Sequence, residues 1–289
     1  MASPTALVWF KRDLRVRDHA ALVEAVHFEN ALGLVVIEPQ WLESPECDPR
    51  HVGFMLDCVA ALQRDLAAHG LPLLVRTGDM PQVLASLRRE FSFTHLFSHE
   101  ETGPGWSYTR DLAVADWCRS QGVPWTELRQ TGVVRRLRSR TGWAGRWAQR
   151  MNAPEAPAAG GFRAATGLQA CAVPTLRGLG LPALGAPLPS GGERAAWATL
   201  DGFFAGRGRN YRRAMSSPLT ATDGCSRLSA HRSHARSQAG LRLARLRQPA
   251  ALALPLHAKT RRRTGHRVAQ RSTQRRWAAC GRRRARRRD

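Results

Sequence analysis

The sequence predicts an α/β fold, a parallel five-stranded sheet flanked by helices, followed by a linker and an incomplete all-helical domain. Three observations support this. Short apolar runs alternate with amphipathic stretches of 10 to 20 residues over residues 1–133. Pro/Gly-rich sequence replaces this pattern over 134–192, and apolar residues at helical spacing return at 193. Strands that alternate with helices of this length are typical of βαβ units and a parallel sheet.

The first strand is expected at Thr5–Phe10, "TALVWF", because an uninterrupted apolar run suits a strand buried on both faces. Four further strands are expected at 31–39, 71–79, 94–101 and 123–130. Helices are expected at 19–28, 51–70, 80–91 and 105–122. Pro81 stands where a first helical turn tolerates proline, and Gly70 and Gly122 stand where helices commonly end.

Ligands of open parallel sheets bind beyond the carboxyl ends of the strands. The loops after Phe10, Glu38, Arg76 and Ser98 are therefore the expected binding positions. The sheet is Rossmann-like, but no G-x-G-x-x-G follows the first strand, so NAD binding is not inferred.

Residues 134–192 are expected to form an interdomain linker. Its stretch 135–150 is basic and carries tryptophans. It either contacts DNA phosphates or is a solvated segment that pairs with neighbouring acids; its arginines are Arg135, Arg136, Arg138, Arg140, Arg146 and Arg150. A helix is expected after it, opened by a capping box from Ser190 to Glu193.

The formal charge of +23 is concentrated in residues 232–289, which hold 19 Lys or Arg and one acid. Residues 1–231 have a net charge of only +5. The tail shows no sustained helical or strand period, so it is expected to be disordered. A genuine basic tail that binds DNA phosphates is the alternative.

The six cysteines, at 47, 58, 118, 171, 225 and 280, form no C-x-x-C and are expected to be buried thiols in a reducing compartment. A structural zinc or disulfide set is the alternative, but no metal site is assigned. No signal peptide and no apolar run long enough for a membrane helix are found. A cytoplasmic monomer without a membrane partner is expected.

Several motifs resemble the DNA photolyase/cryptochrome family in order and spacing: "LVWFKRDLRVRDHAAL" (7–22), "EETGPGWSYTRDLAVADWCRSQGVPW" (100–125), "GGERAAW" (191–197) and "CSRLSAH" (225–231). The resemblance implies an N-terminal antenna domain (1–133), the linker and the start of a helical FAD-binding domain (193–231). It also implies light-driven repair of cyclobutane or 6-4 pyrimidine dimers in DNA, a lyase reaction. Blue-light signalling of cryptochrome type is the alternative, and a free-standing nucleotide-binding α/β module is a third hypothesis.

The resemblance places the FAD phosphates at the S-R-L-S segment, and Tyr211 near the diphosphate. The corresponding residues are Tyr211, Cys225, Ser226, Arg227, Leu228 and Ser229. Cys225 replaces the threonine of many members. Arg12, Asp13 and Arg15 match a loop with an architectural, ion-paired role. An antenna chromophore (folate, deazaflavin or flavin) is implied beside the sheet, where Glu100 and Glu101 end the fourth strand; an exposed acidic strand end is the competing interpretation. No catalytic residue is assigned.

Members of the family continue after S-R-L-S with a long helical domain, whereas residues 232–289 are Arg-rich and do not follow that pattern. Lys11 and Lys259 are the only lysines, which indicates a GC-rich gene. The hypothesis that follows is a frameshift near His231, with 232–289 read out of frame. Such a chain is expected to be truncated and inactive and to retain FAD poorly.

Overall fold

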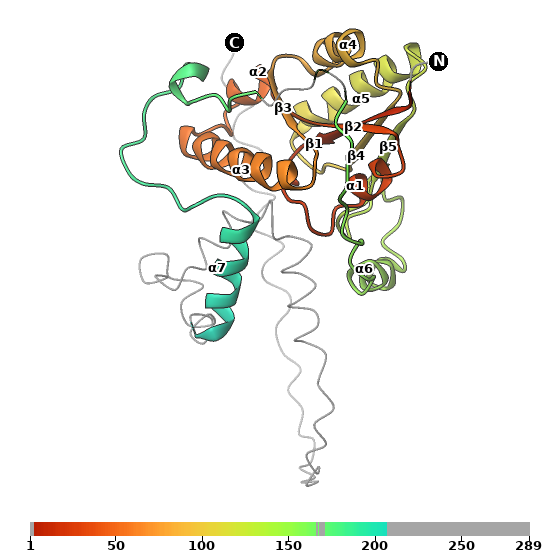
Figure 1. Ribbon diagram of the computed structural model, residues 1–289. Helices are drawn as coiled ribbons and strands as arrows, with labels where there is room; N and C mark the ends of the chain where they lie inside the picture. The colour runs from red at the N-terminus through yellow and green to blue at the C-terminus, as the bar shows by residue number, and fades with distance from the viewer. Residues whose placement is uncertain (1–2, 166, 168–170, 207–289) are drawn as a thin grey trace, which may run out of the picture. The chain divides into compact units, whose positions relative to one another are not determined.

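The computed structural model describes residues 3–165, 167 and 171–206 (Figure 1). The chain divides into two units, 1–248 and 249–289, and every described residue belongs to the first. The described part contains a five-stranded parallel sheet in the order β3-β2-β1-β4-β5, which confirms the predicted fold class. The strands are β1 (Thr5–Phe10), β2 (Asn30–Ile37), β3 (Leu73–Thr77), β4 (His95–His99) and β5 (Trp125–Leu128).

The strands alternate with helices as expected, and three further short or medium helices were not predicted. The expected helices are α1 (Ala20–Ala25), α3 (Pro49–Ala68), α4 (Met80–Phe91), α5 (Gly105–Ser120) and α7 (Glu193–Ala205). The unpredicted ones are α2 (Pro39–Leu42), α6 (Trp143–Met151) and the 3-10 helix η1 (Arg177–Leu179). No helix among the described residues is both long and apolar enough to cross a bilayer.

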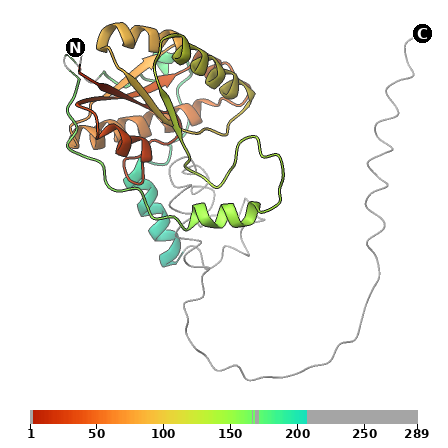
Figure 2. The ribbon, with the colours of Figure 1, turned by 90° about the vertical axis from the view of Figure 1, so that its right-hand side faces the viewer.

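Both faces of the sheet are covered, because successive side chains of a strand point to opposite faces. Ala6, Val8 and Phe10 of β1 pack in the core layer that contains α1 and α3. Leu7 and Trp9 pack in the opposite layer, with α4 and α5. Figure 2 shows the sheet edge-on between these two helical layers. All six side chains of β1 are buried, as the uninterrupted apolar run predicted.

Helix ends follow local capping chemistry. Asp48 precedes α3 and its side chain accepts a hydrogen bond from the Arg50 backbone N–H at 2.8 Å, with Pro49 in the first turn. After α3, Gly70 adopts a φ of 81°, a left-handed conformation that glycine reaches without a Cβ clash. Gly122 does the same after α5. The two glycines therefore end these helices as predicted.

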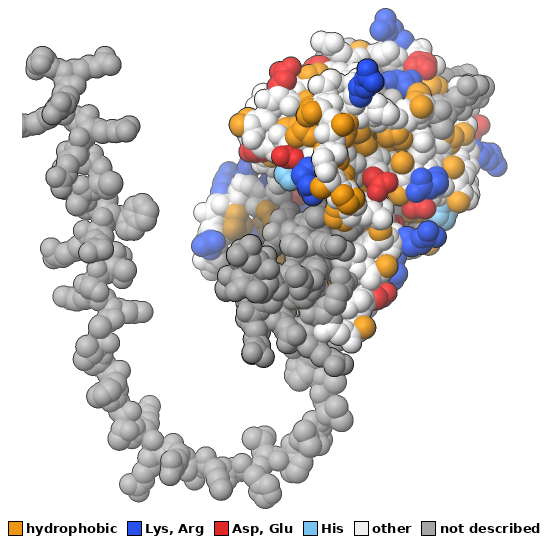
Figure 3. All heavy atoms as spheres, turned by 90° about the vertical axis from the view of Figure 1, so that its left-hand side faces the viewer, with side chains coloured by type: hydrophobic (Ala, Val, Ile, Leu, Met, Phe, Trp, Pro, Cys, Tyr) orange, Lys and Arg blue, Asp and Glu red, His pale blue; other side chains and the backbone are white. Residues whose placement is uncertain are grey.

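The segment 134–192 packs against the α/β domain over part of its length. Ala31 bridges to Ala164, and the backbone N–H of Phe162 donates to the His69 carbonyl. The side chain of Leu188 packs closely on Gly53 of α3. A Cβ added to Gly53 would lie 2.9 Å from a methyl carbon of Leu188. The face bearing α3 shows hydrophobic side chains gathered between scattered charged ones (Figure 3). Contacts between residues distant in sequence order this segment, and local composition does not reveal them.

The capping box predicted at α7 is wrong. The residue that caps α7 is Gly192, with a φ of 95°, and no side chain caps the helix. Gly192 packs on Ala61 so tightly that a Cβ would lie 2.5 Å from the Ala61 Cβ. The Glu193 carboxylate instead accepts from the backbone N–H groups of Val16 at 2.9 Å and Arg17 at 3.3 Å. A tertiary contact with the loop after β1 therefore replaces the local cap.

A buried polar cluster joins the loop after β1 to α1 and β4. One carboxylate oxygen of Asp13 lies 2.6 Å from Nδ1 of His99 and 2.9 Å from Nε2 of His19, the latter outside good hydrogen-bond alignment. The other oxygen accepts from the Lys11 backbone N–H at 2.8 Å. All three side chains are fully buried or nearly so. Arg15 is buried as well, and it donates to the carbonyls of Arg17 and Asp18 and to Gln130. Buried polar contacts therefore hold this loop, but Arg15 forms no ion pair with another described residue, so the ion-paired role expected of it is not confirmed.

The same three side chains lie close enough together to consider a metal ion. His19 argues against one, because its Nδ1 accepts from the Leu22 backbone N–H at 3.2 Å. The proton of a neutral His19 then resides on Nε2, the nitrogen that faces Asp13. That nitrogen has no lone pair to offer a cation. The geometry thus fits an anionic Asp13 held by two imidazoles.

The cluster makes stability depend on pH. Burial and the nearby His99 lower the pKa of His19 to about 4, so its imidazole is neutral at pH 7. Burial alone would raise the pKa of Asp13, but the adjacent imidazoles of His19 and His99 hold it well below its usual value. A lowered histidine pKa means that the unfolded chain takes up the proton first as the pH falls.

We therefore expect the full chain to lose about 3 kcal/mol of unfolding free energy through His19 as the pH falls from about 6.5 to about 4. The Asp13 contribution should disappear only at lower pH, below the usual carboxyl pKa. His19→Asn should flatten the pH dependence of urea unfolding over that window, whereas the exposed control His27→Asn should not. An unchanged pH profile in His19→Asn would contradict this account.

Candidate functional site

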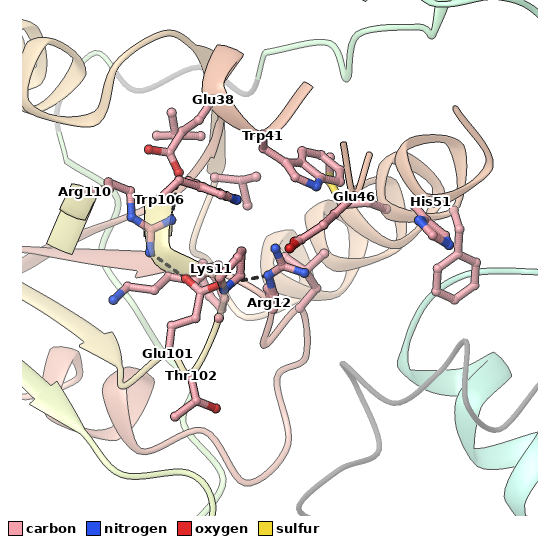
Figure 4. A pocket seen from close by; sticks show the side chains of 18 of the residues that line it. Lys11, Arg12, Glu38, Trp41, Glu46, His51, Glu101, Thr102, Trp106 and Arg110 are labelled. Atoms are coloured by element: carbon pink, nitrogen blue, oxygen red, sulfur yellow. Dashed lines mark hydrogen bonds and ion pairs between the residues drawn. The ribbon is translucent and has the colours of Figure 1, made fainter. Parts of the chain in front are cut away.

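A cavity of about 1020 Å³ opens at the carboxyl ends of β1, β2 and β4. It lies at three of the four predicted loops, those after Phe10, Glu38 and Ser98; no residue of the loop after Arg76 lines it. Its lining includes Trp9, Lys11, Arg12, Glu38, Trp41, Phe54, Met55, Glu100, Glu101, Trp106 and Arg110. Figure 4 shows Glu38, Arg110 and Trp106 on one side and Trp41 and His51 on the other.

The floor of the cavity is built around the guanidinium of Arg110, on α5. It donates to Glu38 at 2.7 Å and to Glu101 at 2.5 Å, at the ends of β2 and β4. It also donates to Asp111 from Nε and Nη2, at 3.0 and 2.8 Å. The four side chains are all less than 10% exposed. Donation in one plane to three separate carboxylates is what a guanidinium offers and an ammonium does not.

A second buried cation, Lys11, lies beneath the first. Its Nζ is 3.1 Å from Asp111 and 3.2 Å from Glu127, and its side chain is 2% exposed. It also lies 4.4 Å from the ring centre of Trp9, and the Arg110 guanidinium lies 4.8 Å from the same ring. Both cations therefore make cation–π contacts with Trp9. The base of the cavity is rigid and its charges are largely neutralised.

The two strand-end glutamates differ in their titration. Burial raises the pKa of Glu38, although the nearby Arg110 opposes the rise. Burial would also raise the pKa of Glu101, but Arg110 and Arg12 lower it below its usual value. Arg110 itself has a pKa above its usual range, because the three carboxylates outweigh its burial. Arg110 thus favours the ionised form of Glu101, whereas burial favours the protonated form of Glu38.

The walls above this floor are aromatic and apolar. Trp41, Phe54 and Met55 line the cavity from α2 and α3, and Trp106 lines it from the first turn of α5. The indole N–H of Trp106 is buried and has no hydrogen-bond partner among the described residues. Buried donors are seldom left unpaired. The site therefore fits a flat ring system that carries a hydrogen-bond acceptor.

Residues 6–142 match the family model described as DNA photolyase. The α/β domain of this chain belongs to the photolyase/cryptochrome family. Over 123 residues the chain is 36% identical to cryptochrome DASH of Gloeobacter violaceus, covering 40% of this chain and 24% of that protein. Over 129 residues it is 28% identical to deoxyribodipyrimidine photo-lyase of a Synechococcus strain, covering 44% of this chain and 26% of that protein.

Solved photolyase structures share the fold. A class III photolyase from Agrobacterium tumefaciens superposes with a TM-score of 0.63 at 21% identity, over 83% of this chain and 51% of that one. A photolyase from Sulfolobus tokodaii, solved with two FAD molecules, gives 0.60 at 20% identity, over 85% and 55%. The match spans about a quarter of the two sequence relatives and about half of the solved chains.

The photolyase-type site residues predicted from sequence have mixed outcomes. Glu100 and Glu101 both line the cavity, and Glu101 is only 6% exposed and ion-paired, so the exposed acidic strand end is wrong for Glu101. Arg12 is half exposed and pairs with Glu101 at 2.8 Å. The predicted FAD residues lie outside the described residues: Tyr211, Cys225, Ser226, Arg227, Leu228 and Ser229.

Four residues of the cavity were not predicted from the sequence: Lys11, Glu38, Trp106 and Arg110. The stretch "WSYTRD" lacks a folate-type Asn–Glu pair, yet its tryptophan and its arginine both line the cavity. A signal for Glu38 was present, because it is the acid directly beyond the second predicted apolar run. No local pattern indicated that Arg110 would reach it, 72 positions away.

The basic stretch 135–150 contains α6, whose Trp143 and Trp147 are 41% and 39% exposed. Arg135 pairs with Glu127 at 2.6 Å, as the solvated-linker interpretation predicts. Arg138 and Arg140 are exposed and form no ion pair with another described residue. DNA contact by this stretch stays a prediction.

Replacing Arg110 with glutamine should lower the unfolding free energy by about 3–5 kcal/mol near neutral pH, because three buried carboxylates lose their shared cation. Without it their folded-state pKa values rise above the unfolded ones, so the destabilisation should shrink as they protonate. The loss should be larger at about pH 8 than at about pH 5 in urea titrations. The exposed pair member Arg119 offers the control, and a loss in Arg119→Gln equal to that in Arg110→Gln would refute the assignment.

Proposed function

We propose that the cavity beyond β1, β2 and β4 binds an antenna chromophore of flavin type. The unpaired indole N–H of Trp106 in an aromatic-walled cavity of about 1020 Å³ is the observation that carries the proposal. The family match over residues 6–142 contains nearly all of the lining. The Sulfolobus tokodaii photolyase holds two FAD molecules, which imply a light-harvesting cofactor in that protein and support a flavin-type ligand here.

A chromophore bound there would absorb light and pass the excitation to a catalytic flavin. The chain's own contribution is to hold the ring. Trp41 offers a flat surface for stacking, the paired charges of the floor keep their positions without a ligand, and the apolar walls exclude water. Deazaflavin and folate remain the alternative ring systems.

For the family reaction, we propose light-driven repair of pyrimidine dimers in DNA with FAD as the electron donor. Tyr211 and Cys225 to Ser229 would supply part of the flavin phosphate contacts. Cryptochrome-type blue-light signalling is the second candidate, because relatives of both names match with similar coverage. Residues 232–289 do not continue the family pattern, so weak FAD retention and an inactive product are part of the proposal.

Riboflavin should bind the full chain saturably, with quenching of its fluorescence. Trp41→Ala should weaken binding by roughly 1–3 kcal/mol of stacking, about 5- to 150-fold in Kd. The exposed Trp143→Ala, outside the cavity lining, is the matched control and should bind like the original protein. Equal losses in both variants would locate the flavin elsewhere.

The repair proposal is tested with an oligonucleotide that carries one cyclobutane dimer, under blue light, with added FAD and a reductant. We expect the purified full chain to show no visible flavin absorption and no dimer splitting, because the family pattern stops after His231. A chain that purifies yellow and splits the dimer would overturn the inactive assignment. A yellow chain that forms a long-lived flavin radical without repair would favour the signalling candidate.

A further inference from the structure

The strongest unexplained feature of the cavity is the indole N–H of Trp106. Its Nε1 is buried and unpaired among the described residues, although Trp106 lies only one residue into α5, at a cavity wall. The Arg110 guanidinium makes a cation–π contact with the Trp106 ring, at 5.5 Å from the ring centre. Losing a hydrogen bond on burial is unfavourable unless a ligand or water restores it. The donor is thus positioned by the protein and left for an acceptor that the described chain does not supply.

Glu38 supplies a complementary acceptor on the same side of the cavity. Its Oε2 accepts from Arg110 at 2.7 Å, and its Oε1 accepts no hydrogen bond within the described residues. The Glu38 side chain is 6% exposed, but Oε1 is not one of the fully buried polar atoms without a partner in the described residues, so this oxygen keeps contact with the solvent-filled cavity. Arg110 contacts both Glu38 and the Trp106 ring, and Figure 4 shows the three grouped together. One fixed cation therefore positions one donor and one acceptor.

We propose that Trp106 and Glu38 form a donor–acceptor pair that recognises the O=C–N–H edge of a planar heteroaromatic ligand. The Trp106 Nε1–H donates to the ring carbonyl oxygen, and Glu38 Oε1 accepts from the adjacent ring N–H. This proposal rests on the proposed chromophore binding in this cavity, and it names the edge of the ligand ring that the protein recognises. Ring systems with such an edge, as in flavins, bind, and rings whose N–H is blocked bind more weakly.

Two matched probes separate the two hydrogen bonds. Trp106→Phe keeps an aromatic side chain of smaller area and removes the indole N–H donor, so its affinity for riboflavin should fall about 10-fold. N3-methylriboflavin keeps the carbonyls and removes the ring N–H, so the original protein should bind it about 10-fold more weakly than riboflavin. In Trp106→Phe the preference for riboflavin over the methylated ring should persist, whereas Glu38→Gln should reduce it.

The ligand-free Trp106→Phe protein provides a second readout. Because it lacks an unpaired buried donor, its melting temperature should equal or exceed that of the original protein. A drop in affinity with an intact melting temperature supports the pair. Riboflavin binding that neither Trp106→Phe nor N3-methylation alters would overturn the pair while leaving chromophore binding intact. Failure of the original protein to bind riboflavin at all would overturn both.

Discussion

The guanidinium of Arg110 is the interaction on which the cavity depends. Three buried carboxylates, from the ends of β2 and β4 and from α5 itself, converge on it at 2.5 to 2.8 Å. Carboxylates so close together in a desolvated place would repel one another strongly without a shared cation. This one side chain therefore joins the two strand ends to the helix above them. It also leaves the floor fixed and nearly neutral, so that a flat ligand can rest on it.

A second buried network does the same for the loop after β1. Asp13 links that loop to β4 through His99, and lies 2.9 Å from His19 at the start of α1. Arg12 leaves this loop to meet Glu101 at the cavity. The two networks meet at the ends of β1 and β4, so contacts within the protein hold the loops that line the cavity. Preorganisation of this kind reduces the ordering cost of binding.

The proposed antenna function rests on where this cavity lies in the chain. It falls almost wholly within residues 6–142, the part that matches the photolyase model, and its aromatic walls suit a planar ring. A light-collecting module needs a fixed chromophore orientation more than it needs reactive groups. The paired acids and arginines hold the floor together, and the proposed recognition depends on the unpaired indole N–H of Trp106. In the proposal, contacts to the FAD phosphates belong to residues such as Tyr211 and Ser226, which lie outside the described part of the chain.

The sequence by itself determined the strands and most helices, because side-chain periodicity and breakers such as Gly70 act within a few residues. The sequence also predicted three of the loops that line the cavity. It further indicated Glu100 and Glu101, the two glutamates at the end of β4, which both line the cavity. It missed α6, whose Trp143 and Trp147 lie among glycines and arginines, and it misassigned the cap of α7. Only the tertiary structure decided that Glu38 and Glu101 share Arg110, because the order β3-β2-β1-β4-β5 places their strands on either side of β1. Electrostatic pairing and burial between distant residues have no local signature, so they emerge only when the chain is folded.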